Sequence, residues 1–79
     1  MRIGLLKLVE SAIKYLSRDD GDGYLSSLQA VLKTPALELS QVELAQMELI
    51  NLSVAARSNG EPVAAVAYLD AILAINKFS

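Results

Sequence analysis

The sequence predicts an all-α protein, a compact bundle of about four helices arranged as two helical hairpins in series. Apolar residues recur with helical spacing through most of the chain, and helix-ending signals separate the periodic stretches. No apolar–polar alternation lasts long enough to indicate a strand. The length of 79 residues suits a single helical domain over residues 1–79, with hairpins at 1–35 and 40–79.

The first hairpin is expected to pair a helix over Arg2–Ser17 with a shorter helix over Tyr24–Lys33. Apolar residues occupy about half of the first helical wheel, and mostly charged residues occupy the other half. The segment Arg18–Gly23 is rich in Gly and Asp, which favour turns. The second helix is expected to end at Thr34-Pro35, because the residue before a proline resists helical backbone angles.

The second hairpin is expected to contain helices over Gln41–Ser58 and Pro62–Phe78. Ser40 is a suitable N-cap for the first of these, and Glu43 three residues later completes a capping-box pattern. Gly60 lies where a glycine commonly follows a helix. A proline at the start of Pro62–Phe78 fits the first turn of a helix.

Two helices of the second hairpin carry more apolar surface than a single core face requires. The helix over Pro62–Phe78 is apolar around more than half of its circumference, so it must be covered on several sides. The third helix has an expected core stripe and a second apolar cluster on nearly the opposite side. The stripe comprises Val42, Ala45, Leu49, Leu52 and Ala56, and the cluster comprises Met47, Ile50 and Val54.

Either the first two helices cover these additional faces or a partner does. An exposed apolar patch of this kind is typical of a protein-binding surface, and methionine suits an adaptable one. The residues predicted to bind a partner are Met47, Ile50, Val54, Val66, Leu69 and Leu73.

The composition excludes several kinds of site. The chain has no cysteine and no histidine, so it has no thiolate metal site, no Ser-His-Asp triad and no Cys-His dyad. We therefore expect neither an enzyme nor a cofactor, and no small-molecule substrate. The net charge of −2 makes nucleic acid an unfavourable partner. The longest strongly apolar run, Val63–Ile75, is shorter than the roughly 20 residues of a membrane span, and a cytoplasmic location is expected.

Two charged motifs have competing interpretations. Asp20-Gly21-Asp22-Gly23 is similar to part of an EF-hand calcium loop, but Arg18 and Gln29 occupy positions where that loop has carboxylates. A turn between helices explains the same residues.

Lys7, Lys14 and Arg18 form a basic stripe that suits an anionic membrane or an acidic groove. A solvated outer helix face, with Glu10 and Lys14 paired, is the favoured alternative.

Residues 39–57 resemble a repressor-type helix-turn-helix, the alternative function. The matches to its opening, first helix and core are Ser40-Gln41, Leu44-Ala45, Ile50 and Ala55. Leu49 lies where the turn normally has glycine, and Ser58 lies where the recognition helix is normally apolar. The resemblance implies that the major groove would be read by Asn51, Ser53 and Arg57. A turn at Leu49 favours DNA binding, whereas an unbroken helix contradicts it.

The second half of the chain resembles a single tetratricopeptide-type helical hairpin. The matching positions are Leu49, Leu52, Ser53 and Ala56 on its first helix, Gly60 in the turn, and Ala64, Tyr68 and Ala71 on its second helix. The resemblance implies protein or peptide binding by stacked helices. The predicted function is accordingly a small non-enzymatic interaction module, such as an adaptor, chaperone-like subunit or inhibitor, that binds a protein partner or itself.

Overall fold

The computed structural model describes residues 5–78 and confirms the all-α fold class. Its elements are α1 (Leu5–Ser17), α2 (Gly21–Leu32), the short 3-10 helix η1 (Ala36–Glu38), α3 (Gln41–Ser58) and α4 (Pro62–Phe78). The predicted bounds of α3 and α4 are confirmed. The first helix ends at Ser17 as predicted, and its expected start at Arg2 lies outside the described residues.

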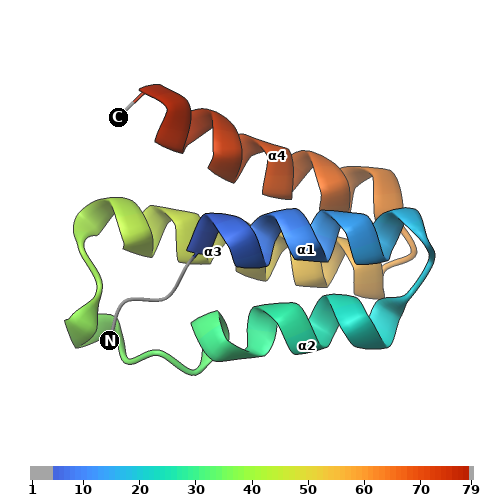
Figure 1. Cartoon of the computed structure of the whole chain (residues 1–79), viewed down its shortest axis with the longest axis horizontal. Coiled ribbons are helices and arrows are strands. Elements are labelled where there is room, and N and C mark those ends of the chain that lie inside the picture. The colour runs from blue at the N-terminus through green and yellow to red at the C-terminus, as the bar shows by residue number, and fades with distance from the viewer. Residues whose placement is uncertain (1–4, 79) are drawn as a thin grey trace.

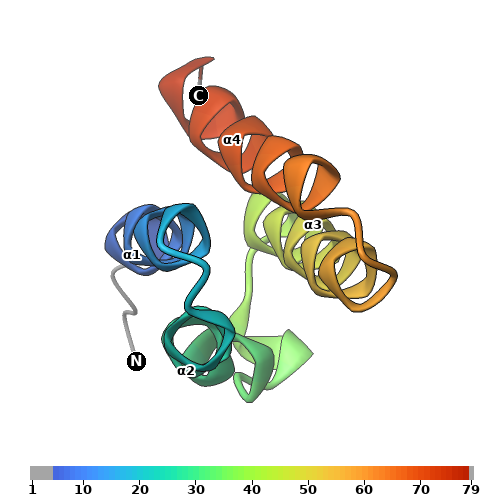
Figure 2. The same cartoon turned by 90° about the vertical axis from the view of Figure 1, so that its right-hand side faces the viewer.

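The helices form two antiparallel hairpins that pack side by side. α1 packs most extensively on α2, and α3 on α4. The hairpins meet where α1 contacts α4 and where α2 contacts α3. Figure 1 shows the axes of α1, α2 and α3 nearly aligned with one another, and the axis of α4 inclined to them. Figure 2, viewed along the helices, shows the α1–α2 pair beside the α3–α4 pair.

The same backbone motif ends the first helix of each hairpin. Asp19 has a φ of 57°, and Gly60 has a φ of 77°. In the first turn the amide of Asp20 donates to the Tyr15 carbonyl at 2.8 Å, and in the second the amide of Glu61 donates to the Ala56 carbonyl at 2.9 Å. These bonds across the helix end, together with the left-handed residue, are those of a Schellman motif. Gly60 indicated this helix end in the sequence because glycine commonly has a positive φ, whereas the aspartate at position 19 did not indicate one.

The second helix begins earlier than the predicted Tyr24. The Asp20 carboxylate accepts a hydrogen bond from the Gly23 amide at 2.9 Å and so caps a helix that starts at Gly21. An Asp N-cap satisfies a donor that would otherwise lack a partner. The glycines therefore lie inside the first turn of α2, and no calcium-binding loop of EF-hand form exists here.

The predicted capping box of α3 is confirmed. The Glu43 amide donates to Ser40 Oγ at 3.2 Å, and the Ser40 amide donates to Glu43 Oε1 at 2.9 Å. These two bonds fix the first residue of α3, because each satisfies a backbone donor at the helix start.

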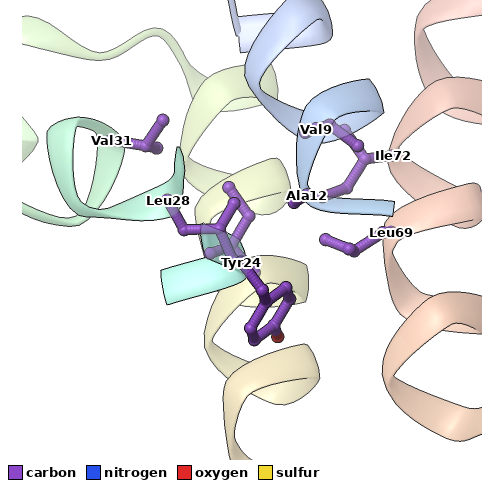
Figure 3. Close-up of a cluster of buried hydrophobic side chains, with 8 residues drawn as sticks. Val9, Ala12, Tyr24, Leu28, Val31, Leu69 and Ile72 are labelled. Carbon is purple, nitrogen blue, oxygen red and sulfur yellow. The ribbon is translucent and has the colours of Figure 1, made fainter. Parts of the chain in front are cut away.

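The core lies between the two hairpins and receives residues from all four α-helices. Figure 3 shows side chains of α1, α2 and α4 converging beside α3. The buried cluster comprises Val9, Ala12, Tyr24, Leu28, Val31, Ile50, Leu69 and Ile72. The predicted division of α1 into an apolar face and a mostly charged face is confirmed, since Val9 and Ala12 are buried while Lys7, Glu10 and Lys14 are exposed.

The predicted core stripe of α3 is confirmed at Ala56, holds in part at Leu49, and is wrong at its other three residues. Val42, Ala45 and Leu52 are exposed, Leu49 is half-buried, and Ala56 is buried. The buried residues of α3 are Gln46, Ile50, Ser53 and Ala56. This buried face lies between the expected stripe and the opposite cluster, because α3 packs against α4 on one side and α2 on the other.

Candidate interaction surface

Two of the six residues predicted to bind a partner are core residues. Ile50 and Leu69 are both 0% exposed and belong to the central buried cluster. Neither can touch a partner while the bundle is folded, so this prediction is corrected. The physical reason is that the first hairpin covers the inner sides of α3 and α4, as the alternative interpretation of the sequence allowed.

The other four predicted contact residues are half-buried. Met47, Val54 and Leu73 pack against the buried cluster, and Val66 is half-buried on α4. They flank the core instead of gathering on an open surface. Their contact with a partner stays a prediction.

A different apolar surface lies on the solvent side of α3. Leu44 is 40% exposed and Leu52 is 46% exposed, with exposed Glu48 midway between them. Residues four apart on a helix lie one above the other, so these three side chains form a row along α3. We call Leu44, Glu48 and Leu52 the α3 ridge. Ala45 is exposed beside the row.

Within the described chain, α3 carries more exposed large apolar residues than any other element, namely Val42, Leu44 and Leu52. Leu37 and Val63 are the most exposed, but each lies alone, in η1 and at the start of α4. Leu25 and Leu32 lie two turns apart on α2 and are 38% and 37% exposed, and Ile75 near the end of α4 is 37% exposed. Single exposed apolar side chains are common on folded proteins, whereas grouped ones mark interaction sites.

Sequence reasoning missed the ridge because it assigned Leu52 to the core. The signal that could have corrected it is Ser53, whose small side chain lets a neighbouring helix approach closely. A packing face centred on Ser53 also contains Gln46, Ile50 and Ala56, and it leaves Leu44 and Leu52 outside.

Ser53 joins three helices through a buried hydrogen-bond relay. Ser53 Oγ donates to the Ala65 carbonyl of α4 at 2.9 Å and lies 2.6 Å from the Tyr24 hydroxyl of α2. Since the serine hydroxyl has one proton, the tyrosine hydroxyl donates to it. Both side chains are fully buried. The relay fixes α2, α3 and α4 at one level of the bundle.

Arg57 covers the edge of this relay. Its guanidinium carbon lies 5.9 Å from the centre of the Tyr24 ring, a cation–π distance. The guanidinium also lies against the backbone of Gly21, where a Cβ atom would overlap it. Burial raises the pKa of the Tyr24 phenol, and the positive charge of Arg57 lowers it in part.

The helix-turn-helix interpretation is contradicted by α3. The helix runs unbroken through Leu49, where a repressor-type motif needs a turn. Ser53, one of the residues expected in the major groove, is fully buried. Arg57 is half-buried over Tyr24. The segment therefore cannot present a recognition helix.

The basic stripe is on the outside of the bundle. Lys7, Lys14 and Arg18 are exposed, while the apolar half of α1 faces the other helices. A membrane-surface helix inserts its apolar face into the lipid. The apolar face of α1 is already occupied, so the solvated outer face is the interpretation that fits.

The residues matched to the tetratricopeptide pattern divide into two groups. Ser53 and Ala56 are buried, while Leu49, Ala64, Tyr68 and Ala71 are half-buried and Leu52 is exposed. The fully buried residues of α4 are Ala65, Leu69 and Ile72. Comparisons with protein families, curated proteins and solved structures found no match to this chain.

The described residues hold no group of three or more carboxylates that could bind a metal ion. Among the helices within residues 5–78, none is both long and apolar enough to cross a membrane.

Proposed function

We propose that this chain is a small non-enzymatic protein–protein interaction module, in the manner of an adaptor, a chaperone-like subunit or an inhibitor. The observation that carries the proposal is the α3 ridge, in which Leu44 and Leu52 remain exposed on a helix whose opposite side is buried. Covering these side chains removes apolar area from water, and that is the main favourable term in protein association.

Two further features support this proposal. The ridge lies on an 18-residue helix that a capping box begins and a tight turn ends, so its side chains have a regular helical arrangement. The absence of histidine and cysteine from the chain agrees with a role in binding. We propose a cytoplasmic location for the protein.

Site-specific photo-crosslinking tests the proposal. A photoreactive amino acid is placed at Leu52 in the full chain, and at exposed Ala67 of α4 as the matched control. We expect a discrete crosslinked adduct from position 52 that position 67 does not give. Mass spectrometry identifies the partner, and calorimetry with the purified partner should show that Leu52→Glu abolishes binding.

The outcomes separate the alternatives. An adduct of two copies of this chain indicates self-association through the same surface. The Leu52→Glu variant must keep its circular dichroism spectrum, as expected for a substitution at a half-exposed position. If position 52 yields no adduct beyond that of position 67, the ridge is not an interaction surface and the proposal is wrong.

A further inference from the structure

Glu48 occupies an unusual position within the α3 ridge. It is exposed and lies between Leu44 and Leu52, with Ala45 and Asn51 as its other neighbours on the helix. No hydrogen bond or ion pair from the described part of the chain holds its carboxylate. A partner that covers Leu44 and Leu52 must therefore also cover Glu48.

A covered carboxylate requires a cation. Removing an ionised group from water without a partner charge is strongly unfavourable, and a well-placed Lys or Arg compensates it. We propose that the α3 ridge binds an amphipathic helix of another protein that presents one lysine or arginine to Glu48 from within its apolar face. This inference rests on the proposed function and deepens it.

The charge of the second hairpin agrees with a basic partner. Residues 36–79 contain five acidic residues and two basic ones. One of the basic residues, Arg57, is turned inward over Tyr24. Complementary charge of this kind accelerates association and selects among partners.

The shape of the ridge agrees with a helical partner. The eight residue steps from Leu44 to Leu52 rise about 12 Å along α3, roughly two helical turns. Rows of residues spaced by four are the ridges that fit into the grooves of another helix. A partner helix of three to four turns would cover Leu44, Glu48 and Leu52 together.

A second copy of this chain does not supply such a helix. One of its exposed cations, Lys33, caps the end of α2 after Leu32, so it does not lie between the exposed Leu25 and Leu32. The others in the described residues, Lys7, Lys14 and Arg18, lie on the outer face of α1. In the described part of α1, no large apolar side chain is exposed beside them. A copy docked through α1 would bring charge to Glu48 and nothing apolar to Leu44 and Leu52, so the partner is a different protein.

Two synthetic peptides test the inference on the full chain. Each is an 18-residue amphipathic helix with a leucine and alanine face, and they differ only in a central lysine or glutamate within that face. Their affinities are measured by fluorescence anisotropy for the unchanged protein, for Glu48→Lys, and for the matched control Asp70→Lys on the exposed side of α4.

The unchanged protein should bind the lysine peptide about 30-fold more tightly than the glutamate peptide. Glu48→Lys should reverse this preference, and Asp70→Lys should keep it. Equal binding of both peptides, or an unchanged preference in Glu48→Lys, overturns the inference and leaves the apolar docking of the proposed function intact. Binding of neither peptide also overturns it, and crosslinking from position 52 then decides the proposed function separately.

Discussion

At the scale of single residues, the relay from Tyr24 through Ser53 to the Ala65 carbonyl is the most consequential polar feature of the core. Ser53→Ala removes the acceptor of the Tyr24 hydroxyl and leaves that donor buried without a partner. We expect a loss of about 1–3 kcal/mol in the free energy of unfolding. Tyr24→Phe leaves Ser53 donating to Ala65, so its loss should be nearer 1 kcal/mol. Urea denaturation measures both.

The double variant is the control for this prediction. When both hydroxyls are removed, no donor remains unsatisfied, so the combined loss should be smaller than the sum of the two single losses. Additive losses would show that the two side chains act independently and that the relay does not stabilise the fold.

The ionisation of Tyr24 should make the stability of the protein depend on pH in alkaline solution. Burial raises the pKa of this phenol above its ordinary value of 10.0. Above about pH 10 the unfolded chain ionises at Tyr24 while the folded chain does not, so the unfolded state is favoured. The free energy of unfolding should be unaffected by Tyr24 below pH 10 and should fall as pH rises beyond it.

Urea denaturation between pH 8 and pH 11.5 measures this effect, with Tyr24→Phe as the control. The contribution of Tyr24 is the difference between the two proteins, and its slope cannot exceed about 1.4 kcal/mol per pH unit. If the alkaline loss is the same in Tyr24→Phe, it originates elsewhere in the chain.

At the scale of the helices, two glycines in the first turn of α2 should respond differently to alanine. A Cβ on Gly23 would overlap the Tyr15 ring where α1 and α2 approach closely. A Cβ on Gly21 would meet the guanidinium at the end of the flexible Arg57 side chain, which can move away. Alanine alone favours a helix over glycine by up to about 1 kcal/mol. We expect Gly23→Ala to destabilise by about 1–3 kcal/mol and Gly21→Ala to be nearly neutral.

Thermal denaturation of the two variants measures this difference, and each serves as the control for the other. A Gly23→Ala protein as stable as the unchanged one would show that α1 and α2 separate without cost. Equal destabilisation in both variants would instead show that Arg57 is held firmly over the start of α2.

Most helix boundaries were predictable because they depend on local chemistry, and the start of α2 was the exception. Ser40 and Glu43 form the capping box that their spacing indicated, and Pro62 begins α4. The inner face of α3 was not predictable in this way, because apolar residues surround the helix. The side of α3 that is buried depends on its contacts with α2 and α4. In the structure these two helices cover the side that carries Ser53 and Ile50.

At the scale of the whole molecule, the broad apolar surface of α4 is explained by two neighbours. α4 packs against α3 on one side and against α1 on another, so Leu69 is fully buried and Leu73 packs against the core. The sequence showed that several sides of α4 had to be covered, but not whether a partner or this chain would cover them. Because α1 covers this side of α4, the candidate binding surface is the α3 ridge and not a face of α4.

This closure also predicts that neither hairpin folds alone. The fully buried side chains come from both halves, with Tyr24 and Leu28 from the first and Ile50 and Leu69 from the second. Separation exposes these residues to water, and helices of 12 to 18 residues are marginal by themselves. Peptides of residues 1–35 and 36–79 should each lack a cooperative thermal transition by circular dichroism. An equimolar mixture should regain helical signal, since the two halves bury each other's core. A cooperative transition in 36–79 alone, at the midpoint of the full chain, would contradict this and show that α3 and α4 form a self-sufficient unit.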